Sequence, residues 1–458
     1  MYNTSRLLDI IDRAYGGPVC DEKEFDLNYV ADGIAAIVKK YDIRFNKEMI
    51  IQQDDDIIDR VWQAGLECFE QCGVYCTSTS RRITFSRQEI EEVIRWAPSR
   101  VIIGEGADAR TEVHREVEDS RPPIIIGGPI GTPLSEDMYI PIMQSYIQEP
   151  IVDTVTSGTL ETTYGRRPRT RSPLEVVSAW QEVELIFAAA RRAGRPGMAL
   201  GAVQMGISDV GYLSGISRNG YRPTDWHMIA MLSELKTNAE LLNKVAHSVQ
   251  QNGIIHGFYN PILGGLGGGE EGLAVLIVAG IIGLQMIYMA TTHCTAPTTP
   301  SLPISSLPQV LRSISAAISA ISRNSNLMTD VMTQPIGGPG TDILLYECVA
   351  TATVATVCGA SRLMGPRSAT GVYTNHCTGL ESRFNGEVGH AAARLSREEA
   401  DPIVKKAVES YLPQVRSKPF GRRFEELYDP VLLRPGEAWL AIYEQAKAQA
   451  IEWGLGLG

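Results

Sequence analysis

The chain has 458 residues, of which 44% are hydrophobic and 21% are charged, and its formal net charge is −11 at pH 7. This composition is ordinary for a folded protein, and the acidic balance argues against nucleic acid as a partner, because phosphate binding needs a basic surface. Eight cysteines are too sparse in so long a chain for a disulfide framework. Residues 1–17 mix charged and apolar side chains without the apolar core of a signal peptide, so we expect a cytoplasmic enzyme.

Helical patterns flank a central region at both ends of the chain. Apolar residues recur at helical spacing within residues 1–120 and again within residues 396–458. The clearest such stretches are Asp54–Cys72, Arg87–Ala97, Glu398–Leu412 and Gly436–Trp453. We therefore expect a central domain over residues 121–395, with an N-terminal helical extension and C-terminal helices added to it.

Short apolar runs recur through the centre of the chain, each followed by Gly, Pro, Ser or Thr and then by a longer helical pattern. The runs are Val101–Gly104, Ile124–Gly127, Val152–Thr156, Gly197–Gly201, Ile254–Phe258, Leu284–Ala290, Leu327–Met332 and Arg362–Gly365. Eight strands that alternate with helices predict an α/β fold, a (β/α)8 TIM barrel. The first of them would precede residue 121.

The helices between these runs are marked by their ends and by their apolar spacing. They are predicted at Pro173–Ala193, Asp225–Gln251, Pro308–Ser322 and Ile343–Val357. Ser172 and Pro173 form a typical helix start, and Gly194 a typical stop. Within Asp225–Gln251, apolar side chains such as Met228, Met231 and Leu232 follow one another at intervals of three and one, which favours a helix.

Residues Leu273–Thr292 carry no charge and are numerous enough to cross a bilayer. Gly280 and Gly283 divide this run into a short apolar helix and a β-like piece, and no aromatic belt or basic flank accompanies it. We therefore expect a buried helix followed by a barrel strand, and no membrane association.

The loops that follow the strands of such a barrel meet at one mouth, where a functional site is expected. Candidate ligand contacts at the starts of these loops are Tyr259, Asn260, His293, Thr295, Gln334, Thr341 and Asp342. Each of them alone could instead cap its loop by a hydrogen bond. The chain contains neither a Gly-x-Gly-x-x-Gly fingerprint after a strand nor a phosphate-binding Gly-Lys-Ser/Thr loop, which disfavours common nucleotide chemistries.

Metal binding is an open alternative at the same mouth. His293 and Cys377 each belong to a His-Cys dipeptide that follows a barrel strand, and His256 could supply a third zinc ligand. The alternative is that these are core or hydrogen-bonded histidines. A second cysteine group, Cys68, Cys72 and Cys76, has no nearby histidine to complete a zinc site.

Collinear blocks over nearly the whole chain resemble one known family. They are Gly73-Val74-Tyr75-Cys76-Thr77, Gly127–Pro133 with Ser135-Glu136-Asp137, Val152-Asp153-Thr154-Val155, Gly194–Met198, Leu235-Lys236, Ala246-His247, Gly379–Arg383 and Gly386-Glu387-Val388. The pattern is similar to the archaeal monomethylamine methyltransferases. The resemblance implies a (β/α)8 barrel that forms homohexamers and passes a methyl group from a methylated amine to the cobalt of a separate corrinoid protein. It implies no tightly bound cofactor, because the partner protein carries the corrinoid.

The chain departs from this family at the reactive position. Gly201 stands where the family carries pyrrolysine, and the surrounding glutamates and glutamine of the family correspond to Met228, Phe258 and Met332. All three changes run from polar to apolar, as expected if polar groups were removed together with their buried partner. We expect an enlarged chamber above Gly201, relined by these side chains and by neighbouring Tyr259.

Such a chamber suits a small quaternary amine, which leaves as a neutral amine and needs no covalent adduct. An aromatic wall of Phe258 or Tyr259 would hold the cation. The proposed substrate-binding set is Gly201, Met228, Phe258, Tyr259, His293, Met332, Gln334, Glu381 and Arg383, the last two as a carboxylate site or as a structural pair. The leading hypothesis is a pyrrolysine-independent methyltransferase. The alternatives are a zinc-dependent enzyme acting on a methylthio or methoxy donor, and an inactive barrel that serves as a binding or assembly subunit.

Overall fold

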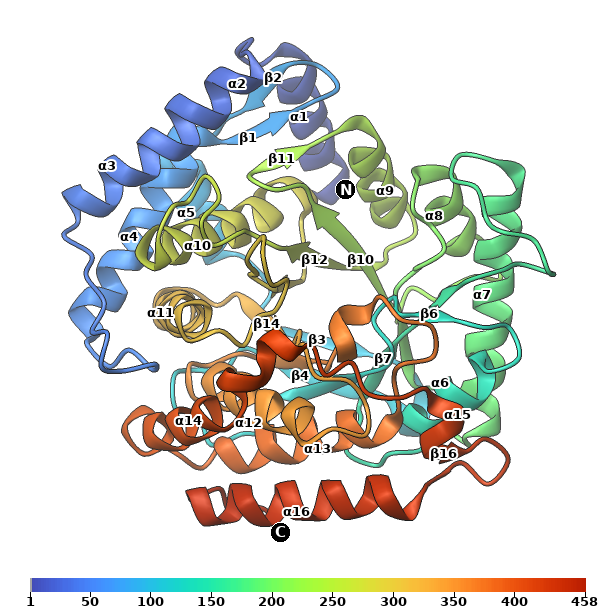
Figure 1. Cartoon of the computed structure of the whole chain (residues 1–458). Coiled ribbons are helices and arrows are strands. Elements are labelled where there is room, and N and C mark those ends of the chain that lie inside the picture. The colour runs from blue at the N-terminus through green and yellow to red at the C-terminus, as the bar shows by residue number, and fades with distance from the viewer. Residues whose placement is uncertain (1) are drawn as a thin grey trace.

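The computed structural model describes residues 2–458, with side chains described from residue 4 onward. Its centre is a barrel of eight parallel strands (Figure 1). They are β5 (Ile124–Gly127), β7 (Thr154–Thr156), β9 (Ala199–Gly201), β10 (Trp226–Met231), β12 (Ile254–Tyr259), β13 (Thr292–Thr295), β14 (Met328–Met332) and β15 (Arg362–Met364). Each strand lies beside the next one in the chain, and β15 pairs with β5. The predicted (β/α)8 fold is confirmed.

The hydrogen-bonded order begins at β10 and ends at β9, so these two strands meet at a seam where they lie in contact. A side chain joins them there. The carboxylate of Asp225, just before β10, accepts a hydrogen bond from the Leu200 backbone N–H of β9 at 2.9 Å. Arg222 forms an ion pair with the same carboxylate at 2.8 Å. A buried, paired aspartate thus takes the place of a ladder bond at the seam.

Helices cover the outside of the barrel. In chain order they are α6 (Tyr139–Ile147), α7 (Pro173–Arg192), α8 (Asp209–Gly215), α9 (Ala239–Gln250), α10 (Glu270–Tyr288), α11 (Pro308–Asn324), α12 (Asp342–Val357) and α13 (Gly379–Ala392). One large hydrophobic cluster fills the space between this layer and the strands, and a second, smaller one lies among the inward-facing side chains of the barrel.

The two ends of the chain pack on this layer. The N-terminal part contains α1 (Tyr2–Gly16), α2 (Glu22–Glu24), η1 (Phe25–Asp32), α3 (Gly33–Lys40), α4 (Asp55–Cys72), β1 (Val74–Cys76), β2 (Arg81–Ile83) and α5 (Arg87–Arg95). The C-terminal part contains α14 (Arg397–Tyr411), η4 (Leu412–Ser417), α15 (Phe424–Leu427), β16 (Tyr428–Asp429), β17 (Arg434–Pro435) and α16 (Glu437–Trp453). Helix α4 packs on α10 and α11, and α14 packs on α12. Short pairs and turns complete the fold: β6 (Pro133–Leu134) with β8 (Thr159–Leu160), β11 (Lys236–Thr237) with β1, η2 (Gly106–Asp108) and η3 (Ser368–Gly371).

The run Val101–Gly104 is not a barrel strand. It forms β3 (Arg100–Ile103), which pairs antiparallel with β4 (Arg110–Val113). The backbone that follows β3 bonds to Thr224 and Gly197, just before β10 and β9. Because Ile103 packs in the inner hydrophobic cluster, this hairpin closes the amino end of the barrel.

The strand that the sequence analysis missed is β10, which it assigned to a helix over Asp225–Gln251. The helix, α9, begins only after Asn238, whose side chain accepts a hydrogen bond from Leu241 N–H. Residues of β10 fit both patterns, because apolar side chains occur at helical intervals as well as at alternate positions. The segment forms a strand because one of its faces lines the barrel interior and the other packs on the helices, so apolar residues are needed at alternate positions.

The predicted strand Leu284–Ala290 is also wrong, because residues 284–288 continue helix α10. Gly280 does not break this helix: a Cβ atom there would lie 2.1 Å from the ring of Tyr259. The glycine lets α10 approach β12 closely. The barrel strand follows as β13. Among the described residues α10 is the one helix long and apolar enough to span a membrane, and 94% of its most apolar window is buried within the protein, in line with the expected core helix.

Replacement of Gly280 by alanine tests this close packing. The added methyl group would meet the Tyr259 ring, so we expect Gly280→Ala to lower the free energy of unfolding by about 1–3 kcal/mol, the usual effect of overpacking. Urea unfolding measures it. The control is Gly16→Ala at the end of α1, where no atom lies within 4 Å of the new Cβ. Equal effects of the two substitutions would contradict the packing argument.

Candidate functional site

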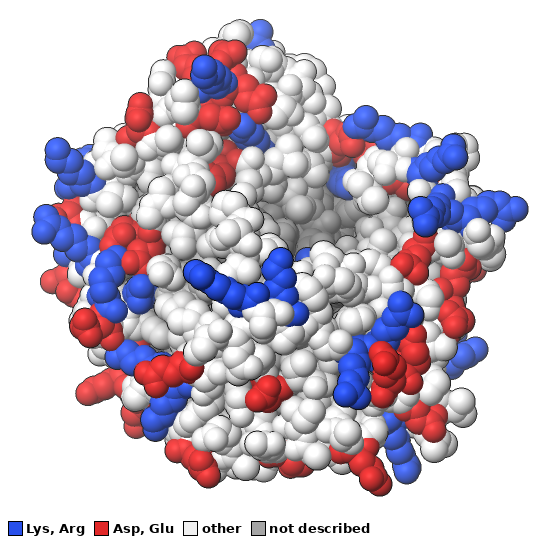
Figure 2. All heavy atoms as spheres, viewed as in Figure 1, with Lys and Arg blue, Asp and Glu red and all other residues white. Residues whose placement is uncertain are grey.

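The carboxyl ends of the barrel strands face a hollow in the middle of one side of the molecule (Figure 2). Inward-facing residues alternate along β10 and β12, and the register places Ala230 opposite Phe258. Phe258 and Met228 pack against the inner cluster but remain partly exposed, and Ala230 is exposed. The floor of the hollow is therefore apolar and has an aromatic ring beside a small residue.

Gly201 ends β9 inside the barrel, and Trp226 of β10 fills the space beside it. A Cβ atom at Gly201 would lie 2.3 Å from the Trp226 indole. The indole Nε1 donates a hydrogen bond to the Thr154 hydroxyl at 2.8 Å, and Trp226 is fully buried. The expectation of an empty chamber directly at Gly201 is therefore wrong, because the indole occupies that volume. Met228 and Phe258, further along β10 and β12, are partly exposed.

The structure brings four of the predicted site residues into the barrel interior. Gly201, Met228, Phe258 and Met332 lie on inward-facing positions of β9, β10, β12 and β14. The last three belong to the inner hydrophobic cluster, in which Met332 is 3% exposed. The three polar-to-apolar positions inferred from the family resemblance are thus part of one packed surface.

Other predicted site residues point away from the hollow. Tyr259 is fully buried against Gly280 of α10, so Phe258 alone of the pair faces inward. His293 lies between the strands and the helices, where its ring nitrogens contact Gln285 at 3.0 Å and the Met328 carbonyl at 3.1 Å. Gln334 is 5% exposed, and its amide donates to the Pro303 carbonyl, which ties two mouth loops together.

Glu381 and Arg383 do not form a carboxylate-binding pair at the mouth. Glu381 is fully buried and caps the start of α13, where it accepts hydrogen bonds from Thr378 N–H and from the Ser368 hydroxyl. Arg383 lies on the partly exposed side of the same helix and pairs with Glu387 at 2.9 Å. These contacts correspond to the second possibility for the two residues, a structural role rather than binding of a substrate carboxylate.

Buried carboxylates brace the mouth loops, a feature that the sequence analysis missed at two further positions. Glu182 of α7 accepts hydrogen bonds from the backbone N–H groups of Gln204 and Met205, in the loop that follows Gly201, and from the Tyr221 hydroxyl. Glu347 of α12 does the same for the loop after β14. The sequence contains one indication of these buried carboxylates. A single glutamate on the apolar face of a helix is expected to be buried, and a buried carboxylate needs hydrogen-bond donors.

The zinc ligands predicted from sequence do not come together. His293 faces the helices, and Cys377 packs near Tyr146 and Glu381 in the outer cluster. His256 instead lies inside the barrel with Cys294 and Asp330, and their potential ligand atoms all lie within 4.8 Å of one another. Below the hollow, burial raises the pKa of Asp330 to about 6 although Arg362 opposes the shift. The sequence could not show this group, because its members sit on three strands.

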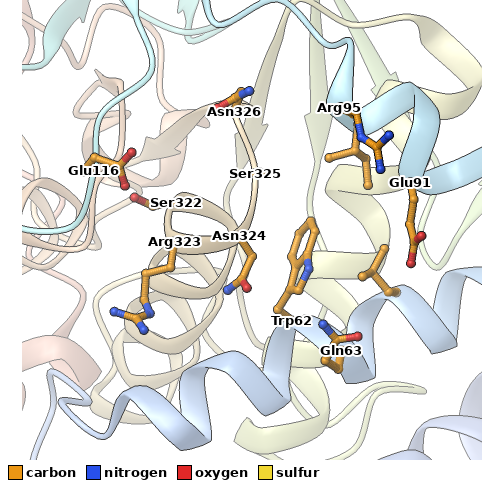
Figure 3. A pocket seen from close by; sticks show the side chains of 12 residues that line it. Trp62, Gln63, Glu91, Arg95, Glu116, Ser322, Arg323, Asn324, Ser325 and Asn326 are labelled. Carbon is orange, nitrogen blue, oxygen red and sulfur yellow. The ribbon is translucent and has the colours of Figure 1, made fainter.

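A groove of about 450 Å3 lies elsewhere, between α4, α5 and the end of α11 (Figure 3). Trp62 and Asn324 face it from α4 and α11. Its residues 324–326 precede β14, so the groove belongs to the amino end of the strands. Functional sites of such barrels lie at the carboxyl end, and we place the candidate site in the hollow over β10 and β12.

Comparison with known proteins identifies the family to which the chain belongs. Residues 6–455 match the family described as monomethylamine methyltransferase MtmB. The chain belongs to this family. It is 34% identical over 447 residues to monomethylamine methyltransferase MtmB2 of Methanosarcina acetivorans and 32% identical to MtmB1 of Methanosarcina barkeri, and each match covers 98% of this chain and 97% of the relative.

The solved structures of the family give the same result. The crystal structure of the Methanosarcina barkeri monomethylamine methyltransferase superposes with a TM-score of 0.96 at 32% identity and covers 98% of both chains. The structure of a hydroxylamine complex of the same enzyme matches equally well. This chain therefore shares the architecture of the methyltransferase family throughout its length, although about two thirds of the aligned residues differ.

The contact between Gly201 and Trp226 can be tested by a double-mutant cycle. Gly201→Ala places a methyl group against the indole, and we expect it to lower the free energy of unfolding by about 1–3 kcal/mol. In a Trp226→Ala background the clash is absent, so the same substitution should cost much less. Urea unfolding of the four proteins gives the coupling energy. Additive effects would show that the indole does not restrict position 201.

The carboxylate of Glu182 predicts a pH dependence of stability. Burial outweighs its hydrogen-bond donors and raises its pKa to about 7, above the ordinary 4.5. Between these values the folded state holds a proton that the unfolded state has released, so the free energy of unfolding falls as the pH rises.

Glu182→Gln removes this titration. The stability advantage of the wild-type chain over the variant should therefore shrink as the pH rises from about 5 to about 8, as measured by urea unfolding at several pH values. Glu184→Gln, at an exposed position on the same helix, is the matched control and should show a constant difference. A wild-type advantage over Glu182→Gln that stays constant, or grows with pH, contradicts the assignment.

Proposed function

We propose that this protein transfers a methyl group from a small quaternary amine to the cobalt of a corrinoid protein, without pyrrolysine. The observation that carries the proposal is the packing of Trp226 against Gly201. It leaves no room for a reactive side chain at the position where the family carries one. The partly exposed side chains of Met228 and Phe258, closer to the mouth, suit an apolar or cationic group rather than a primary amine.

The chemistry of the donor fits this lining. In the transfer, the bond between nitrogen and the methyl carbon breaks, the electron pair stays on nitrogen, and the methyl group is taken by the reduced cobalt of the corrinoid. A quaternary ammonium leaves as a neutral tertiary amine, so it needs no covalent activation by the protein. The remaining task of this chain is to bind the donor and to aim its methyl group at the mouth.

Phe258 is the residue that would hold the cation. Its ring faces inward beside the exposed Ala230, whose small side chain leaves room for a ligand against the ring. An aromatic face attracts a cation with about 0.5–2 kcal/mol, more when water is excluded. Met228 adds polarizable apolar contact at the same level of the barrel.

The mouth also offers a surface for the corrinoid protein. Segment 416–423 bonds to the loops after β14 and β15, through Pro419 to Gly338 and through Phe420 to His376. It carries the exposed residues Arg416, Lys418, Arg422 and Arg423, none of which has an ion-pair partner among the described residues. Figure 2 shows basic side chains next to the hollow. We further propose that an acidic face of the corrinoid protein docks here, and that the enzyme works in the cytoplasm as a homo-oligomer, a homohexamer as in the family.

A spectroscopic assay tests the proposed reaction. The purified chain is mixed with a corrinoid protein in the cobalt(I) state and with tetramethylammonium or another small quaternary amine, and methylcobalt is followed by its absorbance. We expect methylcobalt from quaternary donors and none from monomethylamine. Activity confined to monomethylamine, or no methylcobalt from any N-methyl donor, contradicts the proposal.

Variants at neighbouring positions test the role of the aromatic wall. Phe258→Leu removes the ring and should raise the KM for the quaternary donor about 2- to 30-fold, as expected from a loss of 0.5–2 kcal/mol. Tyr259→Phe, one residue along the same strand but facing α10, should leave the KM unchanged. Equal KM values for the wild-type chain and Phe258→Leu would exclude a cation–π contact at this ring.

The zinc alternative keeps one specific observation in its favour, which is the group formed by His256, Cys294 and Asp330. A Lewis acid there would act on a methylthio or methoxy donor, whose heteroatom has a lone pair to offer. A quaternary amine has none. The two functions are therefore separated by the donor that supports methylcobalt formation.

A further inference from the structure

The interior of the barrel below the hollow holds a layer of buried polar groups that the proposed reaction does not use. It consists of Glu112 from the β3–β4 hairpin and of His256, Thr292, Cys294, Asp330 and Arg362 from four adjacent strands. All of these side chains are completely buried. Burying so many charged and polar groups is costly unless they are paired with one another or with an ion.

We propose that His256, Cys294 and Asp330 bind a zinc ion inside the barrel. The register places Cys294 directly beside Asp330 on the neighbouring strand, and His256 approaches them from β12. The His256 Nε2 atom lies 3.5 Å from an Asp330 carboxylate oxygen, too far for a good hydrogen bond but compatible with two ligands of one metal ion. Their potential ligand atoms, with the Cys294 sulfur, lie within 4.8 Å of one another.

The atoms that face this space lack other partners. His256 Nε2 and both carboxylate oxygens of Asp330 are buried without a hydrogen bond. Unsatisfied buried groups are rare in folded proteins, and here His256 Nε2 and an Asp330 oxygen lie within 4.8 Å of each other and of the Cys294 sulfur. A cation would satisfy both atoms at once, since each can present a lone pair.

The far side of the histidine has the support typical of a metal ligand. Its Nδ1 atom lies 2.7 Å from the Thr292 hydroxyl and 3.2 Å from Arg362 Nη1, and the hydroxyl accepts a hydrogen bond from the same Nη1 at 2.8 Å. A ligating histidine usually donates its other ring N–H to such a group, which fixes the ring and its tautomer. Trp226 holds the ring from the side, with the two ring centres 5.0 Å apart.

Donor types and charge both favour zinc. Nitrogen, thiolate sulfur and carboxylate oxygen are the ligands that zinc takes in proteins, and one water molecule would complete its four-coordinate shell. The local charges also balance: the ion and Arg362 supply three positive charges, against one each on Asp330, Cys294 as thiolate and Glu112. Glu112 lies 3.4 Å from Arg362 and has no hydrogen-bond partner among the described residues.

This inference does not depend on the donor proposed above, because it concerns the metal alone. The full chain is produced with zinc in the medium, freed of loosely bound metal and analysed by mass spectrometry. We expect about one zinc per chain. X-ray absorption of the same sample should show one sulfur at about 2.3 Å and nitrogen or oxygen ligands at about 2.0–2.2 Å.

Paired substitutions locate the ion. Cys294→Ala and Asp330→Asn should lower zinc affinity at least tenfold, as measured by competition with a chelator. Cys377→Ala, an equally buried cysteine outside the group, and His293→Gln should keep the wild-type affinity. If the site variants fail to fold, the absorption spectrum of the wild-type protein decides instead. Wild-type protein without zinc after incubation with Zn2+, a spectrum without a sulfur ligand, or full zinc binding by Cys294→Ala overturns the proposal.

Discussion

The indole of Trp226 is the contact on which the interior of this barrel depends. It packs against Gly201 across the seam between β9 and β10, where the strands are not joined by a hydrogen-bonded ladder. It also donates to Thr154 on β7 and lies against the His256 ring on its other side. The indole at position 226 therefore requires glycine at position 201, because a side chain there would overlap the ring. Conversely, a side chain at position 201 would require a smaller residue at position 226.

The same residue contacts two kinds of side chain in the interior. Met228, Phe258 and Met332 pack with it in the inner hydrophobic cluster. The Arg362 guanidinium lies 5.2 Å from the indole centre, within the range of a cation–π contact, and pairs with the buried carboxylate of Glu112. The register sets Met228 beside His256 and Phe258 beside Cys294, so apolar and polar side chains of the interior are direct neighbours.

The sequence predicted the barrel because most of its strands and helices follow the expected rhythm, but three segments show the limits of that reasoning. Periodicity could not separate β10 from a helix, because its apolar residues satisfy both repeats. Gly280 was expected to end a helix, but it lies within helix α10 at a close contact with the Tyr259 ring. This contact could not be predicted without the position of that ring. The run at Val101 has the composition of a barrel strand, and its antiparallel partner β4 decides otherwise.

The sequence identified candidate site residues that are neighbours on one strand, but it could not identify a group whose members come from several strands. Alternation on β12 limits the pair Phe258 and Tyr259 to one inward side chain, but which of them faces the hollow depends on the neighbouring strands and on α10. His256, Cys294 and Asp330 are separated by more than thirty residues from one to the next, and their meeting depends on strand register. Glu381 and Arg383 lie in a family motif, yet their partners make them a helix cap and a surface pair.

The buried charges of the interior also bear on whether the barrel has lost its chemistry. A barrel without a function to preserve is expected to lose its buried charges first, because replacing a buried ion pair by apolar side chains is often neutral or stabilising. In this chain Arg362, Glu112 and Asp330 are completely buried inside the barrel, close to the apolar side chains of the inner cluster. The presence of such costly buried charges argues against simple decay of the barrel.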